Sequence, residues 1–264
     1  MVGGVEKYFQ IARCIRDEDT RGDRQPEFTQ LDIELSFVSQ EEILALIEQM
    51  YTEIVHALYP NKRITRTPWP RIKFKEAQEK FSSDKPDLRK DKNDPDELAF
   101  VWVLDFPLFE EEKENGFFAP SHHMFTAPKE EDLDKLDTDP ALVLSYQHDL
   151  VLNGSEIGGG SLRITKPEIQ KKIFDLIGFK REEKAYFEHM LKAFSYGAPP
   201  HGGIACGLDR LLAILEKEPS IREVIAFPKT GEGRDLLMDA PSGIREEQLK
   251  ELGIVIKNKG SDEK

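Results

Sequence analysis

The chain has 264 residues, of which 39% are hydrophobic and 33% are charged, and its formal net charge at neutral pH is −13. This length is enough for one large core, whereas the acidic balance excludes a general nucleic-acid coat protein, which needs a broad basic surface. The two cysteines, Cys14 and Cys206, form no disulfide framework or paired metal motif. We therefore expect a cytoplasmic protein that has no secretory signal and no membrane-spanning helix.

The first predicted element is a hairpin around a loop rich in charges of both signs, within residues 14–32. From Tyr8 onward, and again over residues 30–37, polarity alternates with a period of two, which predicts a sheet with one apolar and one polar face. The apolar set is Leu31, Ile33, Leu35 and Phe37, and the polar set is Gln30, Asp32, Glu34 and Ser36. Arg16 and Glu18 share a face, where a guanidinium fits phosphate oxygens and a carboxylate accepts from an amine. The pattern favours a nucleotide site; alternatively, the charges only pair with one another in solvent.

A helix is predicted after the hairpin, because Ser39 and Glu42 form a capping box and apolar residues then recur at helical spacing. These residues are Ile43, Leu44, Ile47, Met50, Tyr51, Ile54 and Leu58. Prolines then interrupt the pattern, and the highly charged stretch 82–97 is interpreted as a linker-like seam. Residues 100–106 are apolar enough for a buried strand, and residues 257–264 are expected to form a frayed tail.

A second hairpin is predicted by Asn153-Gly154, a strong two-residue turn signal. The turn pairs Val151 with Glu156 and leaves Asp149 diagonal to Glu156 on one face. Two carboxylates in this arrangement can bind Mg²⁺ together with substrate phosphates and water. The alternative is that both carboxylates face solvent beside an ordinary turn.

The run Gly158-Gly159-Gly160 does not match the phosphate-loop motif GxxxxGK[ST]. Its expected use is close approach, because residues without Cβ let the backbone lie against a ligand, and Arg163 beyond them can reach a small carboxylate. Residues 197–212 then predict a glycine-bearing strand followed by a helix, which buries Leu208, Leu211, Leu212 and Leu215. Arg210 lies in the first turn, where a cation opposes the helix dipole, so either it has a function or it is a plain surface residue.

His122-His123 resembles a metal motif only superficially, because no Cys/His cluster with zinc spacing surrounds the pair. We therefore expect no zinc site. The simplest interpretation of His122 from the residues alone is a loop histidine without a special task.

Taken together, these segments resemble the class II aminoacyl-tRNA synthetases, in their aspartate-specific form. Residues 16–18 and 24–32 are similar to the second class II signature, and residues 197–212 are similar to the third. Residues 156–164 and the His-His-x-Phe-Thr element at 122–126 also match segments of these enzymes. The resemblance implies an α+β fold, in which an antiparallel sheet is flanked by helices.

The resemblance also implies roles for individual residues, with Arg16 and Arg210 as the catalytic pair. The expected ATP-binding residues are Arg16, Asp17, Glu18, Gln25, Phe28, Glu156, Gly207, Leu208, Asp209 and Arg210. The expected aspartate-binding residues are Arg16, Asp32, His122 and Arg163, and the expected Mg²⁺ ligands are Asp149 and Glu156. Phe28 and Arg210 would lie on opposite faces of the adenine ring.

The resemblance extends from about residue 2 to about residue 256. It implies a catalytic core, residues 1–256, that is N-terminally incomplete: the anticodon-binding domain, the first class II signature of the dimer interface and an aspartate-binding loop are expected to be missing. A further domain that bacterial enzymes insert would fall at the seam 82–97.

The implied reaction joins L-aspartate to ATP, releases pyrophosphate and passes the aspartyl group to the acceptor end of tRNA, in an enzyme that is a homodimer in the family. Two alternatives remain open. One is a non-catalytic fragment that keeps the fold. The other is a ligase that activates aspartate and passes it to ammonia.

Overall fold

The computed structural model describes residues 1–20 and 22–256, so the predicted tail 257–264 lies outside the described residues. Its strands are β1 (Lys7–Ile15), β2 (Glu27–Ser36), β3 (Arg63–Ile64), β4 (Arg71–Lys73), β5 (Glu97–Leu98), β6 (Phe100–Leu104), β7 (Phe109–Glu114), β8 (Phe117–Pro120), β9 (Gln147–Leu152), β10 (Ser155–Leu162) and β11 (His201–Gly207). Its α-helices are α1 (Gln40–Leu58), α2 (Phe74–Phe81), α3 (Lys135–Thr138), α4 (Pro167–Leu176), α5 (Arg181–Ala185), α6 (Glu188–Ser195), α7 (Leu208–Glu216) and α8 (Glu246–Leu252). Short 3₁₀ helices are η1 (Glu130–Asp132), η2 (Pro140–Leu142) and η3 (Ile221–Val224).

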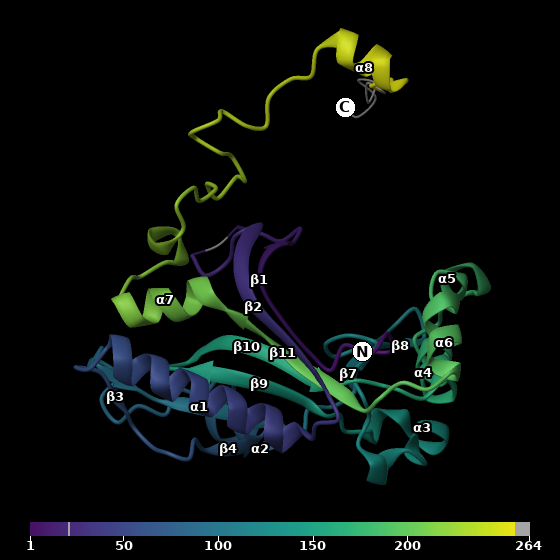
Figure 1. Ribbon diagram of the computed structural model, residues 1–264, viewed down its shortest axis with the longest axis horizontal. Helices are drawn as coiled ribbons and strands as arrows, with labels where there is room; N and C mark the ends of the chain where they lie inside the picture. Colours follow the sequence, from purple (N-terminus) through teal and green to yellow (C-terminus); the bar gives the residue numbers. More distant parts are fainter. Residues whose placement is uncertain (21, 257–264) are drawn as a thin grey trace.

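A seven-stranded sheet organises the fold, in the order β1-β2-β11-β10-β9-β6-β4. Neighbouring strands are antiparallel except β4 and β6, which are parallel. The predicted hairpin is formed by β1 and β2, and the predicted second hairpin by β9 and β10. The antiparallel sheet flanked by helices confirms the expected fold class, as Figure 1 shows.

Helix α1 begins at the predicted capping box, in which the Ser39 hydroxyl accepts from the backbone N–H of Glu42 and the Glu42 carboxylate accepts from the backbone N–H of Ser39. Such a cap satisfies N–H groups that the first helical turn leaves without partners. The apolar stripe of α1 and two leucines of α7 pack on the same sheet face to form the main core. The core includes Ile33, Ile43, Leu44, Ile47, Tyr51, Trp69, Phe100, Trp102, Leu150, Ile204, Leu211 and Leu215.

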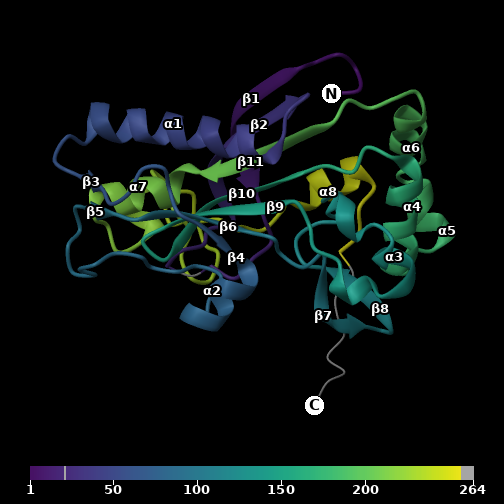
Figure 2. The same ribbon diagram turned by 90° about the horizontal axis from the view of Figure 1, so that it is seen from below.

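Figure 2 shows α1 on one side of the sheet and α2 on the other. Beneath β6 and β9, α2 covers a smaller cluster that contains Ala77, Val101, Val103, Phe106 and Val151. Another cluster, built from Leu108, Phe109, Leu136, Val143, Ile164 and Ile173, joins the β7–β8 hairpin to α3 and α4. Between these two clusters the α2 side of the sheet carries polar side chains of β2, β9 and β10. The fold thus reserves one sheet face for the core and part of the other for a polar site.

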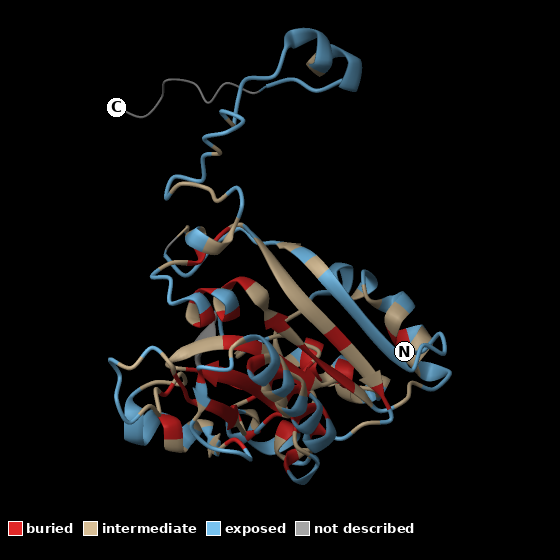
Figure 3. Cartoon of the chain, turned by 60° about the vertical axis from the view of Figure 1, so that its left-hand side comes forward, coloured by how far each residue is buried: buried red, intermediate tan, exposed pale blue. Residues whose placement is uncertain are grey.

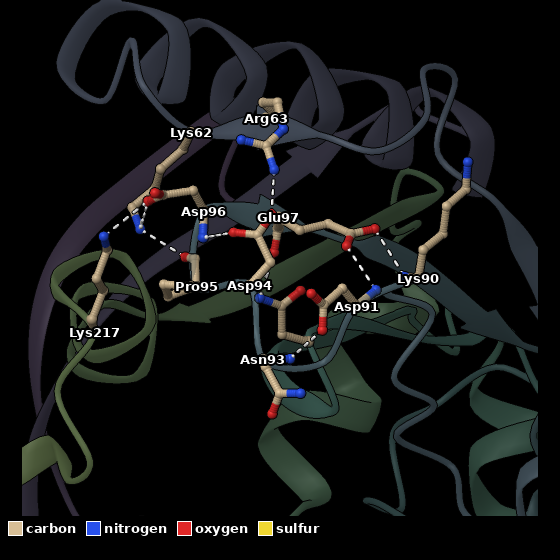
Figure 4. A network of polar contacts seen from close by, with 11 residues as sticks. Lys62, Arg63, Lys90, Asp91, Asn93, Asp94, Pro95, Asp96, Glu97 and Lys217 are labelled. Carbon is tan, nitrogen blue, oxygen red and sulfur yellow. Dashed lines mark hydrogen bonds and ion pairs between the residues drawn. The ribbon is translucent and has the colours of Figure 1, made fainter.

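The stretch 82–97, interpreted from sequence as a linker-like seam, is held to the body by hydrogen bonds (Figure 4). The carboxylate of Glu97, a residue only 8% exposed, accepts from the backbone N–H groups of Lys90 and Asp91, at 2.9 and 3.1 Å. Strand β5 at its end pairs in parallel with β3. A buried carboxylate requires such donors, so this charged stretch closes on itself as a folded connector.

Three apolar predictions are wrong in detail. Phe37 follows the last residue of β2 with a φ of 58° and is 66% exposed, so it leaves the alternation that precedes it. Leu58, the last residue of α1, and Leu212, in the middle of α7, are also exposed, at 69% and 40%. The predicted strand 100–106 ends at Leu104, where Asp105 takes a φ of 56°.

Figure 3 shows how burial falls toward the edges: the sheet centre is buried, whereas β1 and the segment after η3 are largely exposed. No helix among the described residues is long and apolar enough to cross a membrane.

Candidate active site

A cavity of about 510 Å³ opens on the polar face of the sheet, opposite α1. Its walls come from the charged loop between β1 and β2, the glycine run of β10, the end of β11, the start of α7 and the loop that carries the two histidines. Three sequence segments that lie far apart in the chain, 16–30, 147–163 and 205–210, therefore meet at one place.

Arg16 and Glu18 lie at the cavity and form an ion pair, with 3.5 Å between Nη1 and Oε1. The Arg16 guanidinium also lies over the ring of Phe28, 5.1 Å from its centroid. A cation on an aromatic face is stabilised by the ring quadrupole. The Arg16 side chain is 58% exposed, so its guanidinium can turn from Glu18 toward a ligand.

Gln25 is 4% exposed, and both ends of its amide bond the backbone of one residue, Lys229. It donates to the carbonyl of Lys229 at 3.2 Å and accepts from the N–H of Lys229 at 2.7 Å. Thr20 bonds Gly231 in the same segment. These contacts attach the charged loop to residues 229–231, so Gln25, which also lines the cavity, fixes the loop in place.

Asp149 and Glu156 face the same small space, which a side chain at Gly159 would fill. A Cβ at Gly159 would lie 3.1 Å from Asp149 Oδ1 and 3.6 Å from Glu156 Oε1. The predicted pairing of Val151 with Glu156 is confirmed, and a bulge just after Glu156 brings Asp149 opposite Gly159. Two carboxylates that share an open space next to a polar cavity fit the few protein ligands that Mg²⁺ needs when phosphates and water complete its shell.

Two further side chains hold Asp149, which is 4% exposed. Gln147 donates from Nε2 to Asp149 Oδ1 at 2.8 Å, while its own amide oxygen, Oε1, is buried and has no hydrogen-bond partner among the described residues. His122 Nε2 lies 3.7 Å from Asp149 Oδ2. The Asp149 carboxylate is thus oriented from two sides.

Arg163 is fixed by four of its five N–H groups. Nε and Nη2 each lie 3.2 Å from a different carboxylate oxygen of Glu34, and Nη1 donates to Ser161 Oγ and to His123 Nε2, both at 2.7 Å. A bidentate pair of this kind fixes the plane of the guanidinium. Arg163 is therefore presented to the cavity in one orientation.

His123 is neutral in this arrangement. Burial, together with the nearby charges of Arg163 and His122, lowers the pKa of His123 from 6.5 to about 4. Nε2 accepts from Arg163 at 2.7 Å, and Nδ1 lies 3.2 Å from the backbone N–H of Phe125 and 3.3 Å from the Thr126 hydroxyl. The family resemblance implies a role for His122 alone, whereas in the structure both histidines contact site residues, His122 at Asp149 and His123 at Arg163.

Arg210, in the first turn of α7, joins the two sides of the cavity. Its Nη1 donates to the carbonyl of Glu156 at 2.8 Å, and Nε and Nη2 lie 3.4 Å from the carbonyl of Asp23. Its neighbour Asp209 accepts from the backbone N–H of Thr29 at 2.7 Å, which ties α7 to β2. Desolvation by burial raises the pKa of Asp209 above its ordinary value.

Most of the predicted site residues line the cavity: Arg16, Glu18, Gln25, Phe28, His122, Asp149, Glu156, Arg163, Gly207, Asp209 and Arg210. Asp17, Asp32 and Leu208 do not line it. Asp32 lies on the same strand face as Glu34. Its pKa is raised above the ordinary value, mainly by burial and to a smaller extent by the nearby Glu34 carboxylate.

The sequence interpretation missed Arg24, Gln30, His123 and Gln147, all of which line the cavity. A signal was present for Gln30, which shares the polar face of β2 with Asp32. The alternation of β9 also placed Gln147 on the face of Asp149.

Comparison with known proteins assigns the family. Residues 1–231 match the family model of class II tRNA synthetases (D, K and N). The chain is 39% identical to an aspartate–tRNA(Asp/Asn) ligase of Rubrobacter xylanophilus, over 96% of this chain and 63% of the relative. It is 35% identical to an aspartate–tRNA ligase of Listeria welshimeri, over 98% of this chain and 65% of the relative. The chain thus spans less than two thirds of the length of these relatives.

The alignment with the Rubrobacter protein extends over 378 positions, although this chain has 264 residues, so the relative has internal residues that have no counterpart here. Among solved structures, the aspartyl-tRNA synthetase of Entamoeba histolytica has a TM-score of 0.65 at 23% identity, over 89% of this chain and 49% of that chain. The asparaginyl-tRNA synthetase of Pyrococcus horikoshii, complexed with asparaginyl-adenylate, has a TM-score of 0.63 at 21% identity, over 87% of this chain and 54% of that chain. These structural likenesses show that the chain shares the fold of these enzymes.

The match of a family model to most of the chain, relatives above 30% identity that align with nearly all of it, and a shared fold lead to one conclusion: this chain belongs to the class II tRNA synthetases, in the group specific for aspartate, lysine and asparagine.

Proposed function

We propose that this chain carries the catalytic site of an aspartate–tRNA ligase. In the first step the α-carboxylate of L-aspartate attacks the α-phosphate of ATP, which forms aspartyl-adenylate and releases pyrophosphate. In the second step a ribose hydroxyl at the end of tRNA attacks the aspartyl carbonyl and releases AMP. The observation that carries the proposal is the convergence of Arg16, Arg163, Arg210 and two carboxylates in one cavity. The names of the relatives support the choice of aspartate.

Such phosphoryl chemistry depends on positioning and on neutralising charge. Arg16 is assigned to the aspartate carboxylate and the α-phosphate, because it lies in the cavity and can swing from Glu18. Arg210 is assigned to the terminal phosphates and to the adenine face opposite Phe28. Glu18 is assigned to the nucleotide, and Gln25 keeps their loop attached to Lys229.

Mg²⁺ held by Asp149 and Glu156 would neutralise phosphate charge when bound. The shared space over Gly159 supports this assignment. Gln147 and His122 keep the Asp149 carboxylate turned toward that space.

Arg163 is assigned to the side-chain carboxylate of the substrate aspartate. Its contacts with Glu34 fix its plane, and the substrate carboxylate would bind Nη1 and Nη2 in exchange for the present partners of Nη1, Ser161 and His123. Asp32 is assigned to the substrate ammonium group and His122 to aspartate recognition. A substrate with a neutral amide in place of the carboxylate would bind Arg163 less well.

The same proposal implies two macromolecular partners, the acceptor end of tRNA and a second subunit in a homodimer. It also implies that the protein acts in the cytoplasm. In the same proposal, the domain that bacterial enzymes of the family insert would fall at the connector 82–97 of this chain.

An experiment that separates the candidate reactions follows labelled aspartate with ATP and Mg²⁺, in the presence of either tRNA or ammonium. We expect label to enter the tRNA fraction. Formation of asparagine from ammonium would favour the amide ligase. Binding of ATP and aspartate without either product would favour a non-catalytic chain.

A further inference from the structure

A lysine outside the predicted site reaches a predicted metal ligand. Lys85, in the connector 82–97, places Nζ 3.1 Å from Glu156 Oε2. Both side chains are about one third exposed, at 36% and 31%. An ion pair at such exposure contributes little to stability, so the placement of Lys85 at this carboxylate calls for another explanation.

The loop that carries Lys85 has a defined shape. Ser83 Oγ accepts from the backbone N–H of Lys85 at 3.0 Å. Asp87 binds the Arg89 side chain with both carboxylate oxygens and accepts from the Arg89 backbone N–H, and the two side chains are only 16% and 17% exposed. A Cβ added at Gly154, the turn residue just before the strand of Glu156, would lie 3.3 Å from Asp87 Cβ and 3.8 Å from the carbonyl oxygen of Lys85, so the loop lies close to this turn. These contacts hold the backbone of the loop in place and keep the Lys85 side chain directed at Glu156.

The other end of the connector is attached to the helix that carries Arg210. Asp96 pairs with Lys217, the residue that ends α7, at 3.0 Å, and with the nearly buried Lys62 at 3.6 Å (Figure 4). One folded connector thus links Lys85 to the helix of Arg210.

Lys85 and Arg210 also line the same space. A second cavity, of about 170 Å³, is bounded by Lys85, Glu156, Arg210 and Asp23. Glu156, Arg210 and Asp23 line the main cavity as well. A phosphate chain that extends from the main cavity past Arg210 therefore enters a space where Lys85 provides a second cation.

We propose that Lys85 binds the β- and γ-phosphates of ATP and the pyrophosphate that the reaction releases. This assignment rests on the proposed function. When the bond between the α-phosphorus and its bridging oxygen breaks, the electron pair stays on that oxygen and the leaving pyrophosphate gains negative charge. Lys85 balances that charge, and Glu156 is its partner when no phosphate is bound. An ammonium group on a flexible stem suits such an exchange of partners.

The test measures pyrophosphate binding directly by calorimetry, with EDTA present so that no metal contributes. The variants are Lys85→Ala, Lys85→Arg and Lys80→Ala, where Lys80 forms a similar lysine–glutamate pair, with Glu76, on the exposed surface of α2. We expect Lys85→Ala to weaken pyrophosphate binding about 10-fold or more, because a charge-assisted contact is lost. AMP binding should stay unchanged, and so should both affinities in Lys80→Ala. Lys85→Arg should retain most of the pyrophosphate affinity, because it keeps the charge.

Repeating Lys85→Ala in a Glu156→Gln background distinguishes contact from indirect action. The same loss in both backgrounds supports direct binding to phosphate. A loss that disappears with Glu156→Gln would mean that Lys85 only neutralises that carboxylate, and the proposal would be wrong. Equal pyrophosphate binding by wild type and Lys85→Ala, or no binding by wild type, would also overturn it. The fate of labelled aspartate, measured separately, decides the proposed function.

Discussion

The glycine run of β10 allows the fold and the site to be tested separately, by Gly160→Ala and Gly159→Ala. A Cβ at Gly160 would lie 2.0 Å from the carbonyl oxygen of Gly203 and 2.7 Å from Ile204 Cα, both backbone atoms of the neighbouring strand β11. An ordinary contact needs 3.4 Å or more. Strand β11 must therefore move away at the centre of the sheet, where Gly160 pairs with Ile204.

The cost of that movement combines overpacking with weakened ladder hydrogen bonds, and we estimate about 3 kcal/mol or more for Gly160→Ala. At Gly159 the added methyl group would instead meet side-chain atoms of Asp149, Glu156 and Gln147, at 3.1, 3.6 and 3.7 Å. Side chains can adjust, so we expect a loss of less than about 1 kcal/mol in the free energy of unfolding. The methyl group would nevertheless occupy the space that the two carboxylates share.

Urea unfolding followed by circular dichroism measures the first effect, and calorimetry with magnesium ATP measures the second. Gly160→Ala should lower the unfolding midpoint by about 1 M urea or more. Gly159→Ala should keep a midpoint near that of wild type and bind magnesium ATP more weakly. If Gly160→Ala unfolded at the wild-type midpoint, the close packing of β10 on β11 would be refuted. If Gly159→Ala bound magnesium ATP as wild type does, the metal site would be misplaced.

Three further predictions concern a catalytic arginine, a buried histidine and a helix cap. Arg16→Ala should lower kcat/KM for adenylate formation by about 100-fold or more, because its contacts strengthen as charge develops; a rate near that of wild type would remove Arg16 from the mechanism. Burial lowers the pKa of His148 from 6.5 to about 4, so between these values the unfolded chain holds more protons and stability falls as the pH drops, by up to about 3 kcal/mol. The difference in unfolding free energy between wild type and His148→Gln should therefore change across this pH range, and a constant difference would contradict the burial of a neutral ring. Ser39→Ala should cost about 0.5–2 kcal/mol in urea unfolding through loss of the capping box, and an unchanged midpoint would show that the cap is not needed.

The periodic segments could be predicted because their local patterns agree with the fold. The alternation of Leu31, Ile33 and Leu35 fixes which face of β2 enters the core, and the Ser39–Glu42 box fixes the start of α1. Phe37 shows the limit of this reasoning, since a single residue with positive φ ends the alternation without a sign in the polarity pattern.

Contacts between distant segments could not be predicted in this way. The bond between Arg163 and His123 joins residues 40 positions apart, and the Gln25 amide meets Lys229 across 204 positions. The connector 82–97 was interpreted as a linker because its charges outnumber its apolar residues. Its fold depends instead on Glu97, whose buried carboxylate accepts from the backbone. A charge count does not reveal which carboxylate will be buried.

Aspartate activation is measured by the exchange of labelled pyrophosphate into ATP by the purified chain, with aspartate and asparagine compared at equal concentration. We expect exchange that requires aspartate, is much slower with asparagine and loses this preference in Arg163→Leu. If ATP bound to the chain but aspartate caused no exchange, or if asparagine supported exchange as well as aspartate did, the cavity would not be a site of aspartate activation.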